Sequence, residues 1–363
     1  MTDRRNQDAI LSEYDNAAGV FRDLSATAAS LLEKIVAGAG MQIHSITQRC
    51  KDRESLARKL SKSDKDYVQL SDVTDIAAVR ITTYFAEDVD RIAKIIESEF
   101  VIDIDRSIDK RVVLDPDRFG YQSLHYVVSL SDDRSRLPEY SRFTSKQFEI
   151  QVRSILQHAW AEIEHDLGYK SAAGVPREIR RRFSRIAGLL ELADSEFAAI
   201  RKELQTYAAN VAQDIREKPD TVGIDKISLE ALVKTPTAAV RQLSRIVANA
   251  AAAELEPISE QLLDHNITML GFVNVTSIQE LEDLASARKT IVAKFARGWL
   301  GSSRYKTLHE GIGIMYLAYV LLAERADKPA IQRFAKAVRL SSNSGAAIED
   351  RILDVYHAAI EAA

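Results

Sequence analysis

Three polar side chains alternate with apolar ones between residues 148 and 154 of this 363-residue chain. The polar members are Glu149, Gln151 and Arg153, and the apolar members are Phe148, Ile150 and Val152. Because side chains two positions apart share one face of a β-strand, the carboxylate, amide and guanidinium should point the same way while the apolar side chains face a core. The pattern predicts a strand that lines a binding site, and an exposed sheet edge is the alternative.

A cluster of basic residues lies between residues 49 and 59. Arg49 and Lys51 share a side of an extended segment, whereas Ser55 and Lys59, four positions apart, share one face of a predicted helix. Ammonium groups act on phosphates as point charges and guanidinium groups stack on bases, so this cluster suits a polyphosphate nucleotide. A solvated, charged helix is the alternative interpretation.

Two other segments place polar residues on predicted strands. Asp75 precedes a strand over 76–85, and Arg80 interrupts the apolar run of that strand, where a cation needs a partner or a ligand. Segment 120–126 opens with a glycine and carries an aromatic, a hydroxyl and an imidazole on one face, namely Tyr121, Ser123 and His125. Such a face can stack on a base and hydrogen-bond phosphate oxygens.

These residue types are the ones that phosphoryl or pyrophosphoryl transfer requires: carboxylates for magnesium, cations for the phosphates and a well-placed nucleophilic oxygen. Asp75 and Glu149 are the candidate catalytic carboxylates and ligands of a Mg²⁺ cofactor. The chain has neither the glycine–lysine loop of P-loop enzymes nor the glycine-rich loop of kinases. If it uses ATP, it must therefore do so in another way.

The elements that must position these residues follow two periodicities. Helical spacing covers residues 8–37, 53–61, 88–99, 155–168 and 177–213, and strand patterns cover 43–49, 76–85, 100–105, 124–130 and 146–154. This order predicts an α+β fold with a mixed β-sheet of about five strands flanked by helices. We expect this domain to occupy residues 1–217. Residues 222–363 have helical spacing with a weak strand signal near 272–275, so we expect a second, all-α domain.

The composition narrows the class of protein. There are 49 basic and 53 acidic residues, and the net charge of −4 argues against a chain-wide surface for polyanions. Cys50 is the only cysteine, which excludes an intramolecular disulfide and fits a reducing compartment. The chain has neither an apolar run of the ~20 residues that span a bilayer nor a signal-peptide pattern. We expect a cytoplasmic protein without a membrane partner.

The motifs resemble, in the same order, those of the RelA/SpoT synthetase domain. The matching segments are Arg49-x-Lys51-x-x-x-Ser55-x-x-x-Lys59, Asp75–Arg80, Gly120–His125, Glu149–Ser154 and His158–Lys170. The resemblance covers roughly residues 10–205 and implies a nucleotidyltransferase-like fold. It also implies transfer of the β,γ-pyrophosphate of ATP to the 3′-hydroxyl of GDP or GTP, which makes the alarmone (p)ppGpp of the stringent response.

The resemblance also implies roles for individual residues by motif position. On the ATP side, Arg49 and Arg80 would enclose adenine, and Lys51 and Lys59 would bind the triphosphate with support from Ser55. Asp75 would bind magnesium. Glu149 would bind magnesium and draw the proton from the attacking hydroxyl. On the acceptor side, the residues implied are Tyr121 as the platform for the base, His125 as a phosphate contact, and Gln151 and Arg153 as walls of the site.

The chain departs from the family pattern just before Tyr121. Many members have a lysine four residues before the tyrosine and a small polar residue before the glycine, where this chain has Asp117 and Phe119. Arg118, Lys110 or Arg111 could supply the missing charge. Because this segment contacts the acceptor, guanine as the acceptor base is less well supported than ATP as the donor.

Three alternatives therefore stay open. The protein could resemble toxic relatives that pyrophosphorylate the tRNA 3′ end, since an arginine-rich segment follows residue 176, or relatives that make adenosine alarmones. It could also be a noncatalytic nucleotide-binding regulator.

The role of residues 222–363 is also open. They could serve as a dimerisation module, which would make the protein a homo-oligomer, as a sensor that occludes the site, or as an antitoxin-like domain. We expect no alarmone hydrolase activity, because only His44 precedes the synthetase motifs.

Overall fold

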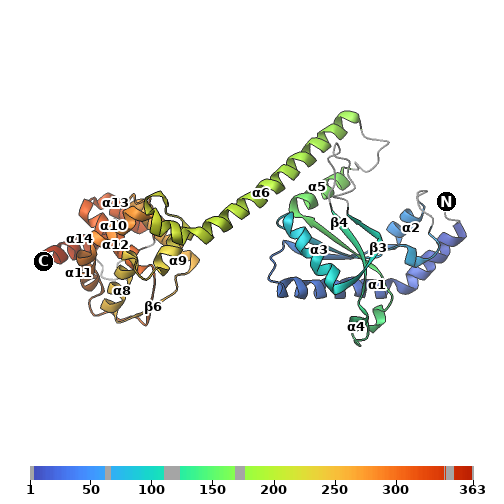
Figure 1. The fold of residues 1–363 in the computed structure, drawn as a ribbon, viewed down its shortest axis with the longest axis horizontal. Helices are drawn as coiled ribbons and strands as arrows, with labels where there is room; N and C mark the ends of the chain where they lie inside the picture. The colour runs from blue at the N-terminus through green and yellow to red at the C-terminus, as the bar shows by residue number, and fades with distance from the viewer. Residues whose placement is uncertain are drawn as a thin grey trace. The chain divides into compact units, whose positions relative to one another are not determined.

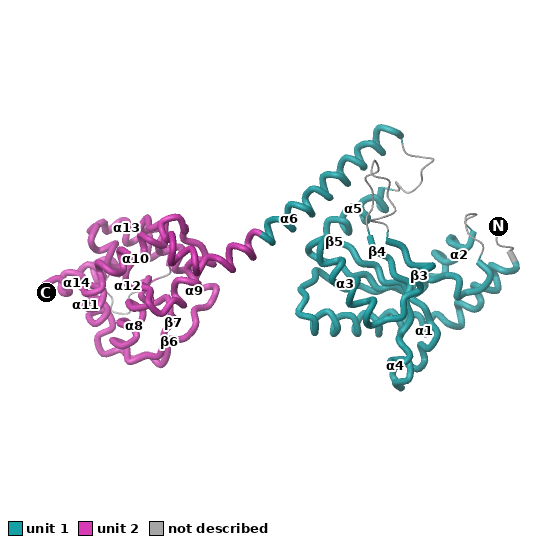
Figure 2. Tube along the Cα trace, in the orientation of Figure 1, with its two compact units in different colours: residues 1–202 teal, residues 203–363 magenta. Residues whose placement is uncertain are grey.

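A computed structural model describes residues 4–61, 67–109, 123–167, 176–338, 340 and 347–361. The chain divides into two units, Met1–Lys202 and Glu203–Ala363 (Figure 2). Each unit has its own hydrophobic core. They are therefore considered one at a time.

Unit 1 is built on a five-stranded mixed sheet with the strand order β1-β2-β5-β4-β3. Its strands are β1 (Ser45–Cys50), β2 (Ala77–Thr83), β3 (Phe100–Asp109), β4 (Leu124–Leu130) and β5 (Phe148–Ser154). Strands β2 and β5 are parallel, and the other neighbours are antiparallel. The predicted α+β fold with a mixed sheet is confirmed. Strand β3 extends to Asp109 rather than Asp105, with a register shift between Asp103 and Ile108.

The helices of unit 1 are α1 (Arg4–Gly38), α2 (Arg53–Leu60), α3 (Glu87–Glu99), α4 (Asp132–Ser135), α5 (Ile155–Asp166) and α6 (Arg177–Glu217), which continues into unit 2. Of these, α1, α3 and α5 contact strands of the sheet (Figure 1). The apolar sides of α1, α2 and α3 share one core with the sheet. Helices α5 and α6 meet in a separate small cluster that contains Trp160, Ala161 and Ala187.

The two faces of the sheet differ because side chains alternate along each strand. Alternate residues of β2, β4 and β5 belong to the core; among them are Val79, Ile81, Tyr126, Val128, Ile150 and Val152. The residues between them lie on the opposite face. The strand register aligns Arg80 with Gln151 across the β2–β5 pair, and His125 with Gln151 across the β4–β5 pair. Polar side chains from separate motifs are thereby brought together on one face.

Unit 2 is helical, as predicted, apart from two short strands. Its helices are α7 (Lys226–Lys234), α8 (Ala239–Ala251), α9 (Glu260–Phe272), α10 (Ile278–Ala287), α11 (Lys289–Leu300), α12 (Ile312–Arg325), α13 (Lys328–Ala337) and α14 (Ile348–Glu361). Helix α12 is apolar on all sides and is buried along most of its length, which identifies it as the central helix of this core. No helix among the described residues is both long and apolar enough to cross a membrane.

The strand signal near residues 272–275 was wrong. Helix α9 ends at Phe272, and a turn follows in which Asn274 has a left-handed backbone with φ 57°. The strands of unit 2 are instead β6 (Glu254–Glu256) and β7 (Thr307–His309), which form a parallel pair. Each has only three residues, so neither is long enough to show an alternating pattern in the sequence.

The boundary between the units lies inside α6, whereas we expected a division between residues 217 and 222. Helix α6 does end at Glu217, next to the expected break. Its last turns, however, contribute Val211 and Ile215 to the core of unit 2. Because burial of these two side chains joins the end of the helix to unit 2, the boundary precedes the end of the helix.

Candidate functional site

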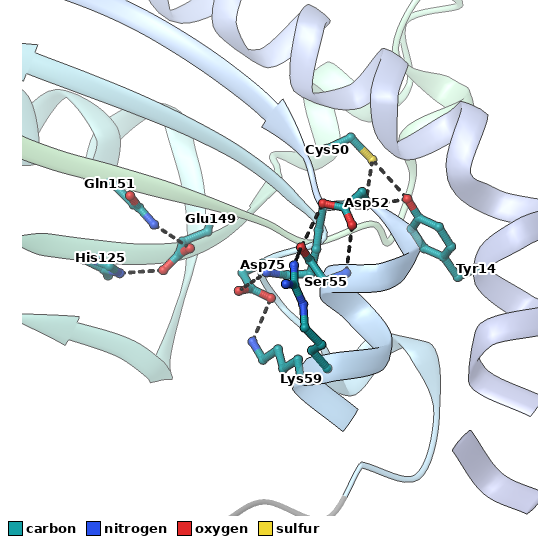
Figure 3. Close-up of polar contacts among 11 residues, drawn as sticks. Tyr14, Cys50, Asp52, Ser55, Lys59, Asp75, His125, Glu149 and Gln151 are labelled. Atoms are coloured by element: carbon teal, nitrogen blue, oxygen red, sulfur yellow. Dashed lines mark hydrogen bonds and ion pairs between the residues drawn. The ribbon is translucent and has the colours of Figure 1, made fainter. Parts of the chain in front are cut away.

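Asp75 lies at the start of β2 and is held by two lysines. Lys51 Nζ is 3.0 Å from Asp75 Oδ2. Lys59 Nζ is 2.7 Å from Asp75 Oδ1 (Figure 3). Burial raises the pKa of the Asp75 carboxyl, but the two ammonium groups outweigh this effect and hold the pKa below its usual value. Asp75 is therefore ionised at neutral pH.

Local structure explains how the two lysines reach one carboxylate. The Lys51 backbone N–H donates to the Ile76 carbonyl at 2.7 Å, which ties the end of β1 to the start of β2. Asp52 then caps α2 by accepting a hydrogen bond from the Ser55 N–H at 2.7 Å. Lys59 follows in the last turn of that helix. The turn between β1 and α2 thus directs both ammonium groups toward the start of β2.

Tyr14 of α1 supports this turn from the core side. Its hydroxyl donates to the Lys51 carbonyl and lies near the Cys50 thiol (Figure 3). Burial, together with the neighbouring Cys50, raises the pKa of Tyr14 to about 12, so the hydroxyl remains a donor at neutral pH. Tyr14 falls within the helical segment 8–37 of the sequence, and no local signal linked it to Lys51.

The second carboxylate, Glu149 of β5, accepts hydrogen bonds from its neighbours on the same face of the sheet. His125 Nδ1 lies 2.6 Å from Glu149 Oε1, and Gln151 Nε2 donates to Glu149 Oε2 at 2.9 Å. Burial raises the pKa of Glu149, whereas the hydrogen bond and charge of His125 and the hydrogen bond from Gln151 lower it; the net effect is a decrease. Both carboxylates are thus ionised at neutral pH.

Asp75 lies two residues before β2, and Glu149 lies in β5, the parallel neighbour of β2. Ala78 of β2 is the register partner of Glu149. The negative charge of Asp75 slightly opposes the decrease in the pKa of Glu149. Figure 3 shows both carboxylates. No group of three or more His, Cys, Asp or Glu side chains that could hold a metal forms among the described residues.

Two arginines border a cavity on the same face. A space of about 120 Å³ is lined by Thr47, Gln48, Arg49, Ala78, Val79, Arg80 and Gln151. Arg80 Nε donates to Gln151 Oε1 at 3.4 Å, so Gln151 joins this cavity to Glu149. Arg49 of β1 and Arg80 of β2 are both among the residues that line this space.

Glu162 of α5 links two of these guanidinium groups. Its Oε1 lies 3.0 Å from Arg80 Nη1 and 3.0 Å from Arg153 Nη2. Burial raises the pKa of Glu162, but Arg153 and Arg80 outweigh it and lower the pKa. Glu162 had no role in our sequence interpretation, although it lies within the motif 158–170. The sequence did place Glu162 four residues after His158, on the same face of a helix. In the structure, His158 Nδ1 lies 3.6 Å from Glu162 Oε1.

The structure brings most of the predicted site residues together. Asp75 contacts Lys51 and Lys59, and Gln151 joins Glu149 to Arg80. Ser55 donates to Asp52 and accepts from Arg58, each at 2.8 Å. Arg153 is only 2% exposed, so its guanidinium lies behind Glu162 and is not an open wall of the site. Arg118 and Tyr121 lie outside the described residues.

Known proteins resemble this chain in the part that carries the site. A family described as a region found in RelA / SpoT proteins matches residues 48–174. GTP pyrophosphokinase YjbM of Bacillus subtilis (strain 168) is 27% identical over 170 residues, which are 46% of this chain and 76% of that protein. GTP pyrophosphokinase YwaC of the same strain is 26% identical over 159 residues, 43% of this chain and 72% of that protein.

Solved structures of related proteins also match. The small alarmone synthetase 1 from Bacillus subtilis is 24% identical with a TM-score of 0.45, covering 53% of this chain and 98% of that chain. A GTP pyrophosphokinase family protein from Streptococcus pneumoniae is 25% identical with a TM-score of 0.46, covering 53% of this chain and 95% of that chain. The family match at residues 48–174 lies entirely within unit 1, where the described site residues are found.

Proposed function

We propose that this protein, which carries a RelA/SpoT region at residues 48–174, is a pyrophosphokinase that uses ATP and GDP or GTP to make (p)ppGpp. Two proteins that resemble it are GTP pyrophosphokinases. The observation that carries the proposal is an ionised carboxylate held by two lysines, Asp75, just before β2, together with a second ionised carboxylate, Glu149, on the neighbouring strand β5. Cations and carboxylates in one place are what pyrophosphoryl transfer requires.

The cations of the site divide between two tasks. Lys51 and Lys59 are the ammonium groups next to Asp75, and we assign them to the triphosphate of ATP. Arg49 and Arg80 border the cavity between β1 and β2, and we assign them to the adenine base. Glu162 and Gln151 hold Arg80 in place from two sides. Holding the reactants in a productive geometry accounts for up to roughly 7–11 kcal/mol of a reaction barrier.

We propose that Asp75 and Glu149 hold a Mg²⁺ ion. Magnesium in phosphate-transfer sites is bound by one or two carboxylates together with substrate phosphates, and this pair provides that donor set. When bound, the ion would neutralise charge that develops on the phosphates. His125 and Gln151 orient the Glu149 carboxylate.

In the proposed reaction, the 3′-hydroxyl oxygen of the acceptor attacks the β-phosphorus of ATP. The bond between that phosphorus and the oxygen bridging to the α-phosphorus breaks, AMP leaves, and the hydroxyl proton passes to Glu149. A general base works best with a pKa near the working pH, and the pKa of Glu149 is lowered, so Glu149 is a weak base. Its main contributions are then to orient the attacking hydroxyl and to supply negative charge. A loose transition state places only a small demand on the base.

The test is to incubate the purified protein with magnesium, γ-labelled ATP and one acceptor at a time: GDP, GTP, ATP or bulk tRNA. We expect the label on GDP and GTP. Label on tRNA alone would instead support the tRNA alternative, in which the exposed arginines at the start of α6 contact RNA. Label on ATP alone would support an adenosine alarmone, and no transfer at all would support a noncatalytic regulator.

Glu149→Gln tests the assigned role of the second carboxylate. We expect loss of transfer by roughly a hundredfold or more, with binding of a nonhydrolysable ATP analogue changed by less than about threefold. The matched control is Asp88→Asn, which removes another buried, ion-paired carboxylate but lies on α3, paired with Arg91 and Arg201. Unchanged turnover of Glu149→Gln would remove Glu149 from the mechanism.

A further inference from the structure

Both carboxylate oxygens of Asp75 are paired with ammonium groups of the protein. Lys59 Nζ lies 2.7 Å from Oδ1 (Figure 3). Lys51 Nζ lies 3.0 Å from Oδ2. The side chains of Lys51, Asp75 and Lys59 are 10%, 19% and 29% exposed, so solvent screens these charges less than those of a surface pair. This group, the lysine–aspartate triad, holds two positive charges against one negative charge.

The donors to Glu149, the other carboxylate proposed to hold Mg²⁺, are of a different kind. They are the imidazole of His125 at 2.6 Å and the amide of Gln151 at 2.9 Å. The amide carries no charge, and a carboxylate oxygen that accepts one hydrogen bond keeps a second lone pair. Glu149 can therefore bind a cation without losing these neighbours. Asp75 differs because both of its oxygens face an ammonium group.

An ammonium group and a Mg²⁺ ion compete for the oxygens of Asp75. Both are cations, so they repel each other across the short span of one carboxylate. Magnesium also gives up its bound water reluctantly and is usually held in proteins together with substrate phosphates. The described residues form no group of three or more His, Cys, Asp or Glu that could hold a metal without such phosphates. In the free protein the triad therefore keeps Mg²⁺ from Asp75.

The triphosphate of ATP reverses this competition. Its oxygens carry several negative charges and are stronger partners for Lys51 and Lys59 than the single charge of Asp75. A lysine ammonium group can move between such partners on its flexible four-carbon stem. The backbone of Lys51 stays in place, because its N–H donates to the Ile76 carbonyl at 2.7 Å. Once the lysines turn to the phosphates, Asp75 can bind the ion, and the phosphates add further oxygen ligands.

We propose that the lysine–aspartate triad makes Mg²⁺ binding conditional on ATP. Lys51 and Lys59 hold Asp75 in the free protein and release it when they bind the phosphates. The two lysines thus have a second task beside the binding of ATP, which is to prevent the ion from binding alone. The inference rests on the proposed function for the identity of the ion and the nucleotide. It does not depend on the acceptor or on whether transfer takes place.

The first experiment measures metal binding to the full chain without nucleotide. Mn²⁺ is the probe, because it prefers the same oxygen ligands as Mg²⁺ and its free concentration is read by electron paramagnetic resonance. We expect the unchanged protein to bind Mn²⁺ weakly. Lys51→Met and Lys59→Met each remove one ammonium group and keep much of the side-chain volume. Each should bind Mn²⁺ more tightly by roughly tenfold, and the double variant more tightly still.

The second experiment measures the affinity of the same variants for a nonhydrolysable ATP analogue by calorimetry in the presence of Mg²⁺. Each lysine variant should bind the analogue more weakly by roughly tenfold. The proposal requires these opposite signs, whereas a site that was merely damaged would bind both ligands more weakly. The control is Lys226→Met, which removes the ion pair of a unit 2 lysine with Asp264 at 3.0 Å and should change neither affinity.

A third experiment locates the Mn²⁺ that the lysine variants gain. Adding Asp75→Asn to Lys59→Met should abolish the gain. Adding Asp88→Asn, which changes a buried carboxylate of α3, should preserve it. Circular dichroism of every variant checks that the fold is retained. A gain that survives Asp75→Asn would overturn the proposal, because the ion would then bind elsewhere.

Two results would overturn this inference alone. One is micromolar binding of Mn²⁺ by the unchanged protein without nucleotide, and the other is a pair of lysine variants that bind the analogue weakly and gain no Mn²⁺. If the unchanged protein bound no ATP analogue, the proposed function would fail as well. If both affinities changed as expected but no transfer took place, the inference would stand and only the catalytic assignment would fall.

Discussion

Charged side chains around the site are arranged in sets that share partners. Asp75 is shared by two lysines, and Glu162 is shared by Arg80 and Arg153. Arg153 is almost fully buried, whereas Glu162 is about half exposed. The buried guanidinium of Arg153 needs a negatively charged partner, and Glu162 is that partner. The same carboxylate contacts Arg80 and fixes its position. Glu162 is therefore a positioning residue for Arg80, which we propose contacts the adenine base.

Glu162→Gln tests this role because it keeps the shape of the side chain and removes its charge. We expect binding of a nonhydrolysable ATP analogue to weaken by roughly three- to tenfold, since solvent reduces the strength of a half-exposed ion pair. Isothermal titration calorimetry measures the change. Asp166→Asn, which changes an exposed carboxylate on the same helix, is the control. Equal affinities for the two variants would argue against a positioning role.

Asp194 is a buried carboxylate whose ionisation opposes folding. Burial raises its pKa, while the hydrogen bond from Ser154 lowers it, and the net effect is an increase. The folded protein therefore holds this proton to a higher pH than the unfolded chain does. Protonated Asp194 therefore stabilises the folded protein. This contribution to the free energy of unfolding is complete below the ordinary aspartate pKa of 3.8 and is lost as the pH rises through the raised pKa of Asp194.

Asp194→Asn removes this titration and leaves an oxygen that can accept from Ser154. We expect the free energy of unfolding of the variant, measured relative to the unchanged protein, to increase as the pH is raised from 4 to 7. Urea denaturation at a series of pH values measures it. A difference that stays constant across this range would contradict the assignment.

Among the elements, β5 has the largest part in assembling the site. It pairs with β2 on one side and β4 on the other, so its outward residues meet Arg80 from one neighbour and His125 from the other. Its end continues directly into α5, whose N-cap is Ser154. Because Ser154 also donates to Asp194, the strand, α5 and α6 are joined at one point.

Two helices of unit 2 end at alanines with a left-handed backbone, which offers a test at the level of the element. Ala252 ends α8 with φ 53°, and Ala326 ends α12 with φ 50°. Glycine adopts this conformation without the steric penalty of a Cβ atom. Ala252→Gly and Ala326→Gly should each raise the free energy of unfolding by about 0.5–1 kcal/mol.

Chemical denaturation followed by circular dichroism measures both changes. The control is Ala209→Gly, at an exposed position inside α6, which should lower the free energy of unfolding by about 1 kcal/mol. If glycine destabilised all three positions alike, the left-handed backbone of the two helix ends would not explain the result.

At the level of the whole molecule, the chain combines two cores joined by one helix. The core of unit 1 lies between the sheet and α1, α2 and α3, and the core of unit 2 surrounds α12. Helix α6 begins in one unit and ends in the other. The expected break after residue 217 marks the end of this helix, whereas the packing of Val211 and Ile215 places the preceding turns in unit 2.

Two fragments distinguish these boundaries. A fragment of residues 203–363 keeps Val211 and Ile215, whereas a fragment of residues 218–363 lacks both. We expect the longer fragment to unfold cooperatively and to be more stable by roughly 3–5 kcal/mol, the free energy of burying two such side chains. Urea denaturation of both measures the difference. Equal stabilities would show that unit 2 does not need the end of α6.

Local patterns were sufficient to locate the five strands of unit 1 and the direction of their side chains, but not the end of β3 or the short strands β6 and β7. The alternation over 148–154 predicted that Glu149, Gln151 and Arg153 share a face, and all three lie opposite the core residues of β5. Side chains alternate in direction along any single strand, so this prediction requires no knowledge of the neighbouring strands. The long helical segments were recognised for the same reason.

Contacts between distant segments were decided by packing and register. Tyr14 reaches Lys51 because α1 lies on β1, and Glu162 reaches Arg80 because α5 returns along the sheet. Packing also decided that Arg153 is buried. It likewise decided that the boundary between the units lies within α6, because the end of that helix packs in the core of unit 2. Such contacts join residues that are far apart in sequence, and no periodicity along the chain records which strand or helix will lie beside another.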